Sequence, residues 1–206
     1  MKSVLISIQP YWVFLIIAKA MGRKIDKEKT IEVRKNFPKA EDWDKLVEIY
    51  CSKDKKSFNR IPKEYQPLME KFLGKVVGKW FCDKIYDIKP YFDRPDLLTQ
   101  YECGWKHGEE FDCLSFGEMN AYLLEDNGYG WHISDLKVYG EPKELSEFKA
   151  ICNKVKHYET ESKDFFDHCL HCEYLTEKTS CLDSFACGKF ITRPPQSWQF
   201  IESLGE

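Results

Sequence analysis

Residues 29–35 read K-T-I-E-V-R-K, and the alternation of polar and apolar side chains in this stretch decides the interpretation of the chain. In a β-strand, successive side chains point to opposite faces, so Ile31 and Val33 would face a core together. The opposite face would carry Thr30, Glu32 and Arg34. A short strand with a hydroxyl, a carboxylate and a guanidinium on one face predicts a recognition surface as well as scaffold.

The segment before this strand predicts a core strand followed by a buried helix. Apolar residues alternate over residues 3–8, and Pro10 suits the first turn of a helix over residues 10–21. This helix is apolar on nearly all sides, as buried helices are. The same residues imitate a secretion signal, but Pro10 interrupts the apolar run. We therefore expect residues 1–20 to stay in the folded protein.

Three later segments extend the pattern: residues 74–88 (GKVVGKWFCDKIYDI), 129–139 (YGWHISDLKVY) and 191–202 (ITRPPQSWQFIE). Together with the first strand, the proline-led helix and K-T-I-E-V-R-K, their order resembles the ASCH family of PUA-like domains. The resemblance implies an α+β fold, a PUA-like small β-barrel of ASCH type with flanking helices and a Cys-rich insertion. A single domain would then span residues 1–206, with the insertion at residues 143–190.

Composition favours a folded domain without a global field for polyanions. The chain has 206 residues, 43% of them hydrophobic and 15% aromatic, and its net charge is −3. The charge is unevenly distributed: residues 1–80 carry 18 Lys/Arg against 10 Asp/Glu, leaving 13 against 24 in residues 81–206. A basic N-terminal part that carries the polar strand is compatible with a phosphate-bearing ligand, unless the two halves interleave and cancel.

The compartment is predicted from cysteine usage and hydropathy. Nine cysteines are an odd count, unlike the even count of a secreted disulfide framework. Reduced thiols in the cytoplasm are therefore the preferred interpretation. No segment is long enough to cross a membrane, so no membrane partner is expected.

Further elements follow from local signals. Strands are also expected over residues 45–51, 75–85, 130–139 and 197–202. Ser115-Phe-Gly-Glu118 is a capping box that predicts a helix through about Leu124. Residues 53–72 are interpreted as a basic, proline-containing excursion between two strands.

The polar strand supplies the main candidate binding residues. Arg34 offers a planar fork of donors for a phosphate or a base edge, and Glu32 can accept from an exocyclic amine. Lys29 and Thr30 precede them at the mouth of the strand. As a side chain on a solvated strand face, Arg34 is expected to contribute little to stability.

The family resemblance also implies a possible enzyme. Some small ASCH proteins are amidohydrolases of acylated cytidine that use a Lys, a Thr and a distant Glu. Lys29 matches that Lys, but Glu32 occupies the position of the Thr. A carboxylate cannot replace a hydroxyl nucleophile without changing the intermediate, although Glu32 could act as a general base on water. The candidate catalytic residues are thus Lys29 and Glu32, if the protein is an enzyme.

Other polar and aromatic residues are secondary candidates for the cleft. Ser7 and Gln9 stand at the corner between the first strand and its helix. His132 could line the cleft opposite Glu32, or be a satisfied core histidine. In the segment R-P-P-Q-S-W, Arg193 and Trp198 could cap the cleft, with the indole as a stacking platform or simply as part of the core.

A cysteine cluster in the insertion predicts a structural zinc site. The spacing is C-x2-C-x8-C-x5-C, formed by Cys169, Cys172, Cys181 and Cys187. Four thiolates can complete a tetrahedral zinc site and leave no open position for catalysis. The second pair is spaced more widely than usual, so these residues could equally be small apolar side chains, some of them buried.

These observations together predict an RNA-binding or modified-nucleobase-binding protein whose cleft lies beside residues 29–35. The first alternative is a hydrolase, acting either as an amidohydrolase on an acylated nucleoside or as a ribonuclease. The second alternative is a protein-interaction module of a mobile element that uses the insertion as its partner surface.

Overall fold

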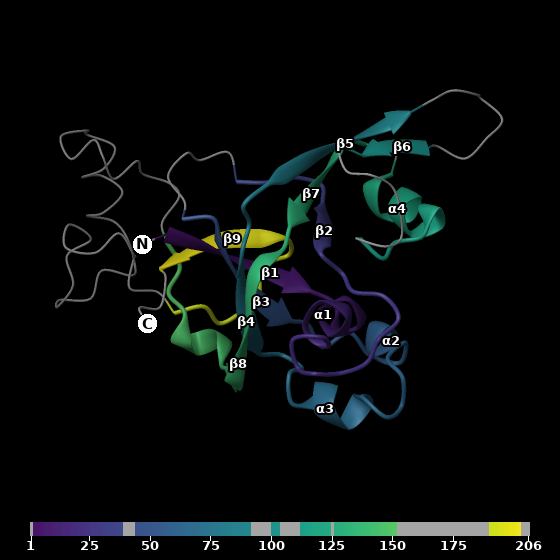
Figure 1. Cartoon of the computed structure of the whole chain (residues 1–206). Helices are drawn as coiled ribbons and strands as arrows, with labels where there is room; N and C mark the ends of the chain where they lie inside the picture. Colours follow the sequence, from purple (N-terminus) through teal and green to yellow (C-terminus); the bar gives the residue numbers. More distant parts are fainter. Residues whose placement is uncertain are drawn as a thin grey trace, which may run out of the picture.

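The structure is a computed structural model that describes residues 2–38, 44–91, 100–103, 112–124, 126–151 and 190–202. Within these residues the strands form two sheets, with helices on one side of the molecule (Figure 1). The protein is thus mixed α+β, as the sequence predicts. The described strands do not close into one barrel, which differs from the predicted fold class.

The larger sheet has the strand order β8-β4-β3-β1-β9. Its members are β1 (Lys2–Ile8), β3 (Leu46–Cys51), β4 (Val76–Phe81), β8 (Ser134–Lys143) and β9 (Trp198–Glu202). Strands β1 and β3 are parallel, and every other pair in this sheet is antiparallel. A parallel pair needs a long crossover, and here that crossover contains α1 and β2.

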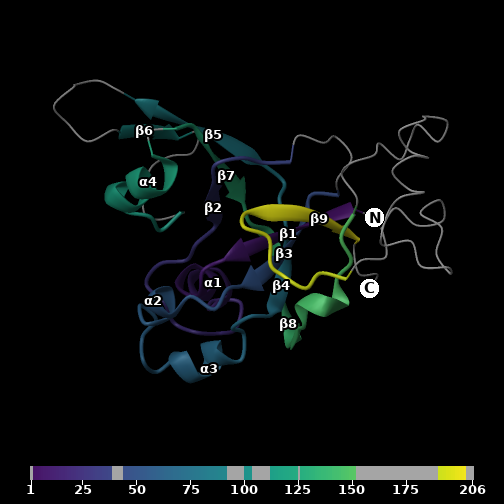
Figure 2. The same ribbon diagram turned by 180° about the vertical axis from the view of Figure 1, so that it is seen from behind.

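The smaller sheet has the strand order β2-β7-β5-β6, and all its pairs are antiparallel. It consists of β2 (Ile31–Arg34), β5 (Ile85–Tyr91), β6 (Gln100–Cys103) and β7 (Gly128–His132). Helix α4 (Phe116–Leu123) lies close to the β5–β6 hairpin, and the view from behind agrees (Figure 2). Ile31, Val33, Ile88, Met119 and Leu123 form the apolar cluster of this part.

Two predicted strands are each divided between the sheets. The expected strand at 75–85 is β4 in one sheet and β5 in the other, and the expected strand at 130–139 is β7 and β8. Both segments change sheet at the same place, because Phe81 pairs with Ser134 in the larger sheet and Ile85 pairs with Trp131 in the smaller sheet. A pair of strands that bends from one sheet into another makes a corner, which apolar periodicity alone does not reveal.

Helix α1 (Pro10–Ile17) packs into the largest apolar cluster, together with the fully buried Trp80 and Trp131. Its residues from Val13 to Ile17 are all buried, as predicted for a helix that is apolar on nearly all sides. The helix is shorter than expected, because the chain continues in turns to Gly22, whose φ of 71° suits glycine.

Of the remaining local predictions, the helix that begins at the capping box is confirmed, and the structure adds helices that were not predicted. The Ser115–Glu118 capping box is present and begins α4. The excursion at residues 53–72 contains two short helices, α2 (Lys55–Phe58) and α3 (Gln66–Glu70), which were not predicted. Part of the predicted insertion is described: the end of β8, a 3-10 helix (Leu145–Glu147) and bridges to neighbouring strands. In the part of the chain that the structure describes, no helix is both long and apolar enough to cross a membrane.

Glu48 on β3 is a buried carboxyl group outside the polar strand. Its side chain accepts a hydrogen bond of 2.6 Å from the Tyr139 hydroxyl, and the residue is 1% exposed. Burial raises the pKa of Glu48 above its ordinary value, and this effect outweighs the opposing influence of Tyr139, Lys79 and Lys143. The folded protein therefore holds the Glu48 proton more tightly than the unfolded chain does.

The raised pKa predicts a pH-dependent stability. The stabilisation from protonated Glu48 is complete below the ordinary pKa and is lost as the pH rises through the raised pKa. Urea unfolding should therefore show wild type losing stability relative to Glu48→Gln between about pH 4 and about pH 7. Glu28→Gln, which changes a carboxylate in an exposed pair with Lys19, is the control. If the difference in the free energy of unfolding between wild type and Glu48→Gln were the same at both pH values, this prediction would be contradicted.

Candidate functional site

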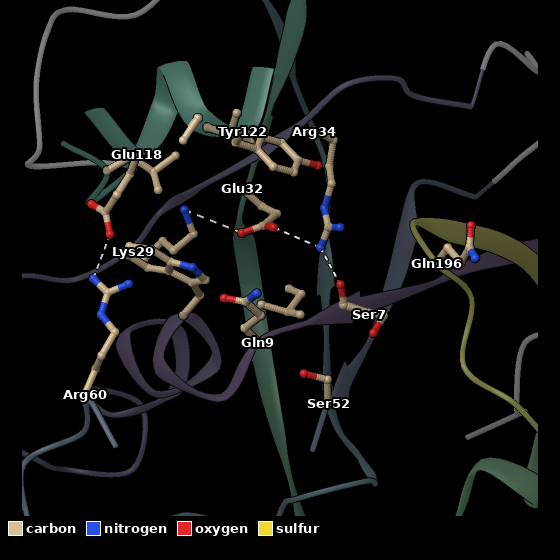
Figure 3. Close-up of a pocket in the computed structure, with 15 residues that line it drawn as sticks. Ser7, Gln9, Lys29, Glu32, Arg34, Ser52, Arg60, Glu118, Tyr122 and Gln196 are labelled. Carbon is tan, nitrogen blue, oxygen red and sulfur yellow. Dashed lines mark hydrogen bonds and ion pairs between the residues drawn. The ribbon is translucent and has the colours of Figure 1, made fainter. Parts of the chain in front are cut away.

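A pocket of about 500 Å³ opens where the end of β1, the start of α1, β2 and α4 meet (Figure 3). Residues from all four elements line it, so the fold brings together segments that are distant in the sequence. The lining side chains are Ser7, Ile8, Gln9, Trp12, Lys29, Glu32, Val33, Arg34, Ser52, Arg60, Leu114, Glu118, Ala121, Tyr122 and Gln196.

Strand β2 is buried on both faces, which corrects the expectation of a solvated polar face. Ile31 and Val33 are 2% and 4% exposed, and Glu32 and Arg34 are only 6% and 7% exposed. The alternation predicted from the sequence does separate the apolar from the polar side chains. The polar side chains are buried where they pair with one another and with the backbone carbonyls of Ser7 and Asp112 from other segments, and no local sequence signal specifies that packing.

A buried ion network occupies the floor of the pocket. The Glu32 carboxylate lies 2.9 Å from Arg34 Nη2 through one oxygen and 3.5 Å from Lys29 Nζ through the other. Lys29 Nζ also donates to the carbonyl of Asp112 at 2.6 Å, and Arg34 Nη2 donates to the carbonyl of Ser7 at 2.7 Å. Figure 3 shows the Lys29 and Arg34 side chains converging on the Glu32 carboxylate. Buried charges persist when they are paired and hydrogen-bonded in this way.

Two buried polar atoms of the lining residues have no hydrogen-bond partner in the part of the protein that the structure describes. They are Arg34 Nε and Ser52 Oγ. Buried donors and acceptors are nearly always satisfied, so such atoms call for a water or a ligand.

The expectation that Arg34 adds little to stability is wrong, since its guanidinium is buried, ion-paired and hydrogen-bonded.

Aromatic and charged side chains complete the pocket walls. The Trp12 ring centroid lies 5.4 Å from Lys29 Nζ, and Tyr122 on α4 is 37% exposed. Burial raises the pKa of the Tyr122 phenol, although the Arg34 guanidinium partly offsets this effect. An aromatic face beside hydrogen-bonding groups is a suitable surface for a planar heterocycle.

An ion pair between Arg60 and Glu118 joins the α2 side of the pocket to α4. The two side chains approach to 2.8 Å, as drawn in Figure 3. Partial burial tends to raise the pKa of Glu118, but hydrogen bonds from Ser115 and the Arg60 charge outweigh it and hold this pKa below its ordinary value. Glu118 is therefore a stable anion at neutral pH that fixes Arg60.

The other predicted residues differ in their distance from the pocket. Ser7 and Gln9 line it, as expected for the corner between strand and helix. Thr30 is partly buried, and its carbonyl accepts from the Ile133 amide. His132 is not among the lining residues, because its ring Nδ1 lies 2.6 Å from an Asp83 carboxylate oxygen on the surface.

The R-P-P-Q-S-W segment contributes a residue that was not chosen. Gln196 lines the pocket, whereas Arg193 and Trp198 do not. The Trp198 indole instead donates to Asn36 Oδ1 at 2.8 Å and packs edge-on against Phe200. Sequence reasoning also missed Trp12, Ser52, Arg60, Glu118 and Tyr122, of which the capping box marked Glu118 only as a helix residue.

The predicted zinc ligands Cys169, Cys172, Cys181 and Cys187 lie outside the described residues, so this site stays a prediction. Across residues 2–38, 44–91, 100–103, 112–124, 126–151 and 190–202, no group of three or more His, Cys, Asp or Glu side chains could hold a metal ion. Burial raises the pKa of the Cys51 and Cys82 thiols to about 12, so neither is a reactive thiolate at neutral pH.

Comparisons with known proteins give matches in structure alone. No protein-family model matches the chain, and no curated protein sequence matches it. Among solved structures, the chain is similar to two mutants of the ZmASCH protein from Zymomonas mobilis. A tyrosine-to-phenylalanine mutant is 15% identical in sequence and has a TM-score of 0.40. The match covers 70% of this chain and 77% of the other. A serine-to-alanine mutant is 13% identical and has a TM-score of 0.46. This match covers 97% of this chain and 88% of the other.

Both structures carry the ASCH name, which agrees with the family that the sequence motifs resemble. At this identity the likeness concerns the fold alone. The chemistry of the pocket is therefore argued from the side chains of this chain.

Proposed function

We propose that this protein binds a nucleotide of RNA or a modified nucleobase in the pocket beside β2. The observation that carries the proposal is the buried set of Lys29, Glu32 and Arg34 on the pocket floor. Two donors that flank one acceptor, all with little exposure to water, provide the directional contacts by which a polar heterocycle is recognised.

The hydrogen-bonding positions of this set that the protein leaves unused match the edges of a base. A carboxylate has about four lone-pair sites, and in Glu32 two protein cations occupy only part of them. The remainder can accept from an exocyclic amine, as carboxylates do with cytosine. Arg34 Nε and Ser52 Oγ are further groups for which a ligand could supply partners. Trp12 and Tyr122 offer rings on which an unstacked base can lie.

The size of the pocket supports a ligand of this class. A cavity of about 500 Å³ falls within the range of roughly 300–1,000 Å³ that small-molecule sites occupy. Its lining combines apolar walls with a few convergent polar groups, which is the composition of a specific site. The positive groups Lys29, Arg34 and Arg60 outnumber the carboxylates of Glu32 and Glu118 on this lining, which favours a ligand that carries phosphate.

A hydrolase is the second candidate, favoured by one contact. Lys29 Nζ lies 3.5 Å from a Glu32 oxygen, and both side chains are almost fully buried at the pocket. In an acylated nucleoside or an RNA strand, Glu32 could take a proton from water while Lys29 stabilises the developing negative charge. Both oxygens of the Glu32 carboxylate already contact cations of the protein, which makes binding the preferred function.

Replacement of Glu32 by Gln separates the two functions. Gln keeps the shape and one acceptor but removes the base, so simple binding of labelled single-stranded RNA or of nucleosides should weaken by about tenfold or less. If the protein is a hydrolase, turnover of an acylated cytidine or of RNA should instead fall by about a hundredfold or more while binding survives. Circular dichroism first establishes that the variant is folded. Unchanged binding and undetectable turnover in both proteins would contradict a role for Glu32.

Three finer expectations stay proposals. A structural zinc ion at the four cysteines and a cytoplasmic location rest on sequence patterns alone. The partner-surface alternative rests on residues 143–190, most of which lie outside the described residues. None of these expectations is needed for the pocket proposal.

A further inference from the structure

A second cavity of about 360 Å³ lies beside α1, and Arg60 lines both cavities. The second cavity is formed by α1, the loop that follows it and the segment between α2 and α3. Its lining side chains are Tyr11, Phe14, Leu15, Lys24, Ile25, Asp26, Lys27, Arg60, Pro62, Glu64 and Tyr65.

Arg60 is held at the junction of the two cavities. Its guanidinium carbon lies 4.0 Å from the Tyr11 ring centroid and 4.7 Å from the Trp12 ring centroid. On its other side Arg60 pairs with Glu118 at 2.8 Å, and 41% of its side chain stays exposed. Cation–π contacts and an ion pair therefore orient an accessible guanidinium between the two cavities.

Two consecutive aromatic residues face different cavities. Trp12 lines the pocket beside β2, whereas Tyr11 lines the second cavity, and their ring centroids are 4.9 Å apart. If a ligand placed one ring against Trp12 and another against Tyr11, the part of the ligand that joins the two rings would lie beside Arg60. Aromatic side chains at successive positions beside cations are the arrangement on which single-stranded nucleic acids stack.

The charge of the second cavity also fits a polyanion. Lys24, Lys27 and Arg60 are exposed cations on its lining, against the carboxylates of Asp26 and Glu64. Tyr65 adds an aromatic wall, and its hydroxyl donates to the Lys24 carbonyl at 3.1 Å, which ties the loop to the α3 side. The cations thus stand on a loop that this bond holds in place.

We infer that the second cavity binds the nucleotide adjacent to the one in the pocket, with Arg60 contacting the phosphate that links them. The ligand is then a single-stranded oligonucleotide and not a free nucleoside. This inference rests on the proposed function of the pocket, and it adds Tyr11, Lys24 and Lys27 to the binding surface.

The test compares an oligonucleotide with single nucleotides on a double variant, Lys24→Ala with Lys27→Ala. The probes are a fluorescein-labelled mixed-sequence RNA of roughly ten nucleotides and the 5′-mononucleotides of the common bases. The variant should bind the RNA about tenfold more weakly, and the slope of log affinity against log salt should fall by about 0.7 for each lost phosphate contact. Mononucleotide affinities should not change, because neither lysine lines the pocket beside β2.

A second double variant, Lys71→Ala with Lys89→Ala, is the matched control. It removes the same charge from exposed lysines that line neither cavity, and it should bind the RNA like wild type. Equal loss in both double variants, or unchanged RNA affinity in the folded Lys24/Lys27 variant, would overturn the second cavity while leaving the pocket proposal standing. If wild type binds neither the RNA nor any mononucleotide, the pocket proposal and this inference fail together.

Discussion

Replacement of Glu32 by Ala should lower the free energy of unfolding by about 3–5 kcal/mol. Glu32 is the shared counter-ion of two cations, and the Lys29 and Arg34 side chains are only 2% and 8% exposed. Without the carboxylate, two positive charges remain buried next to each other, and their hydrogen bonds to the backbone carbonyls of Asp112 and Ser7 do not neutralise them. Leaving a buried charge uncompensated is among the most destabilising single changes known for proteins.

Urea unfolding at neutral pH measures this loss, and Glu28→Ala is the control. Glu28 pairs with Lys19 at 2.8 Å, but these side chains are 33% and 69% exposed. An exposed ion pair contributes about 0–1 kcal/mol, so the control should stay close to wild type. Equal stability of the Glu32 and Glu28 variants would mean that water reaches the pocket floor and screens its charges.

The part of the fold that the sequence predicted correctly rests on local signals. Pro10 and the apolar run after it indicated α1, and the Ser115–Glu118 capping box indicated α4. The alternation in K-T-I-E-V-R-K identified Glu32 and Arg34 as pocket residues, although Val33 lines the pocket as well. Each of these signals concerns residues within one or two turns or along one strand, where backbone geometry fixes the relation of side chains.

The features that the sequence did not predict depend on long-range packing. The chain passes from one sheet to the other between Phe81 and Ile85, and nothing in this short stretch specifies a change of sheet. Arg60 and Glu118 meet only because the fold brings the segment after α2 and helix α4 to the same pocket at the start of α1. His132 was a candidate either for the cleft or for the core, but its ring pairs with Asp83 at the corner between the sheets.

The burial of Glu32 and Arg34 changes how the site must be tested. Substitutions at these positions alter stability and binding together, so a loss of binding alone would have two explanations. A cleaner probe is an exposed residue of the lining that has no role in the ion network. Ala121 on α4 is exposed and lines the pocket, and Glu is a good helix former at such a position.

Ala121→Glu should weaken binding of single-stranded RNA by about tenfold or more, equivalent to about 1.4 kcal/mol or more. The new side chain takes up space in the pocket and adds a negative charge where the ligand's base and phosphate would lie. Thr192→Glu adds the same charge at an exposed position outside the pocket, so it should bind the RNA like wild type.

Equilibrium binding of fluorescein-labelled single-stranded RNA to these three proteins, compared by fluorescence anisotropy at one salt concentration, tests the central claim most directly. A pocket beside β2 that holds a nucleotide predicts tight binding by wild type and Thr192→Glu and a clear loss in Ala121→Glu. Equal affinity of all three folded proteins would contradict this account, because the RNA would then bind at a surface other than the pocket.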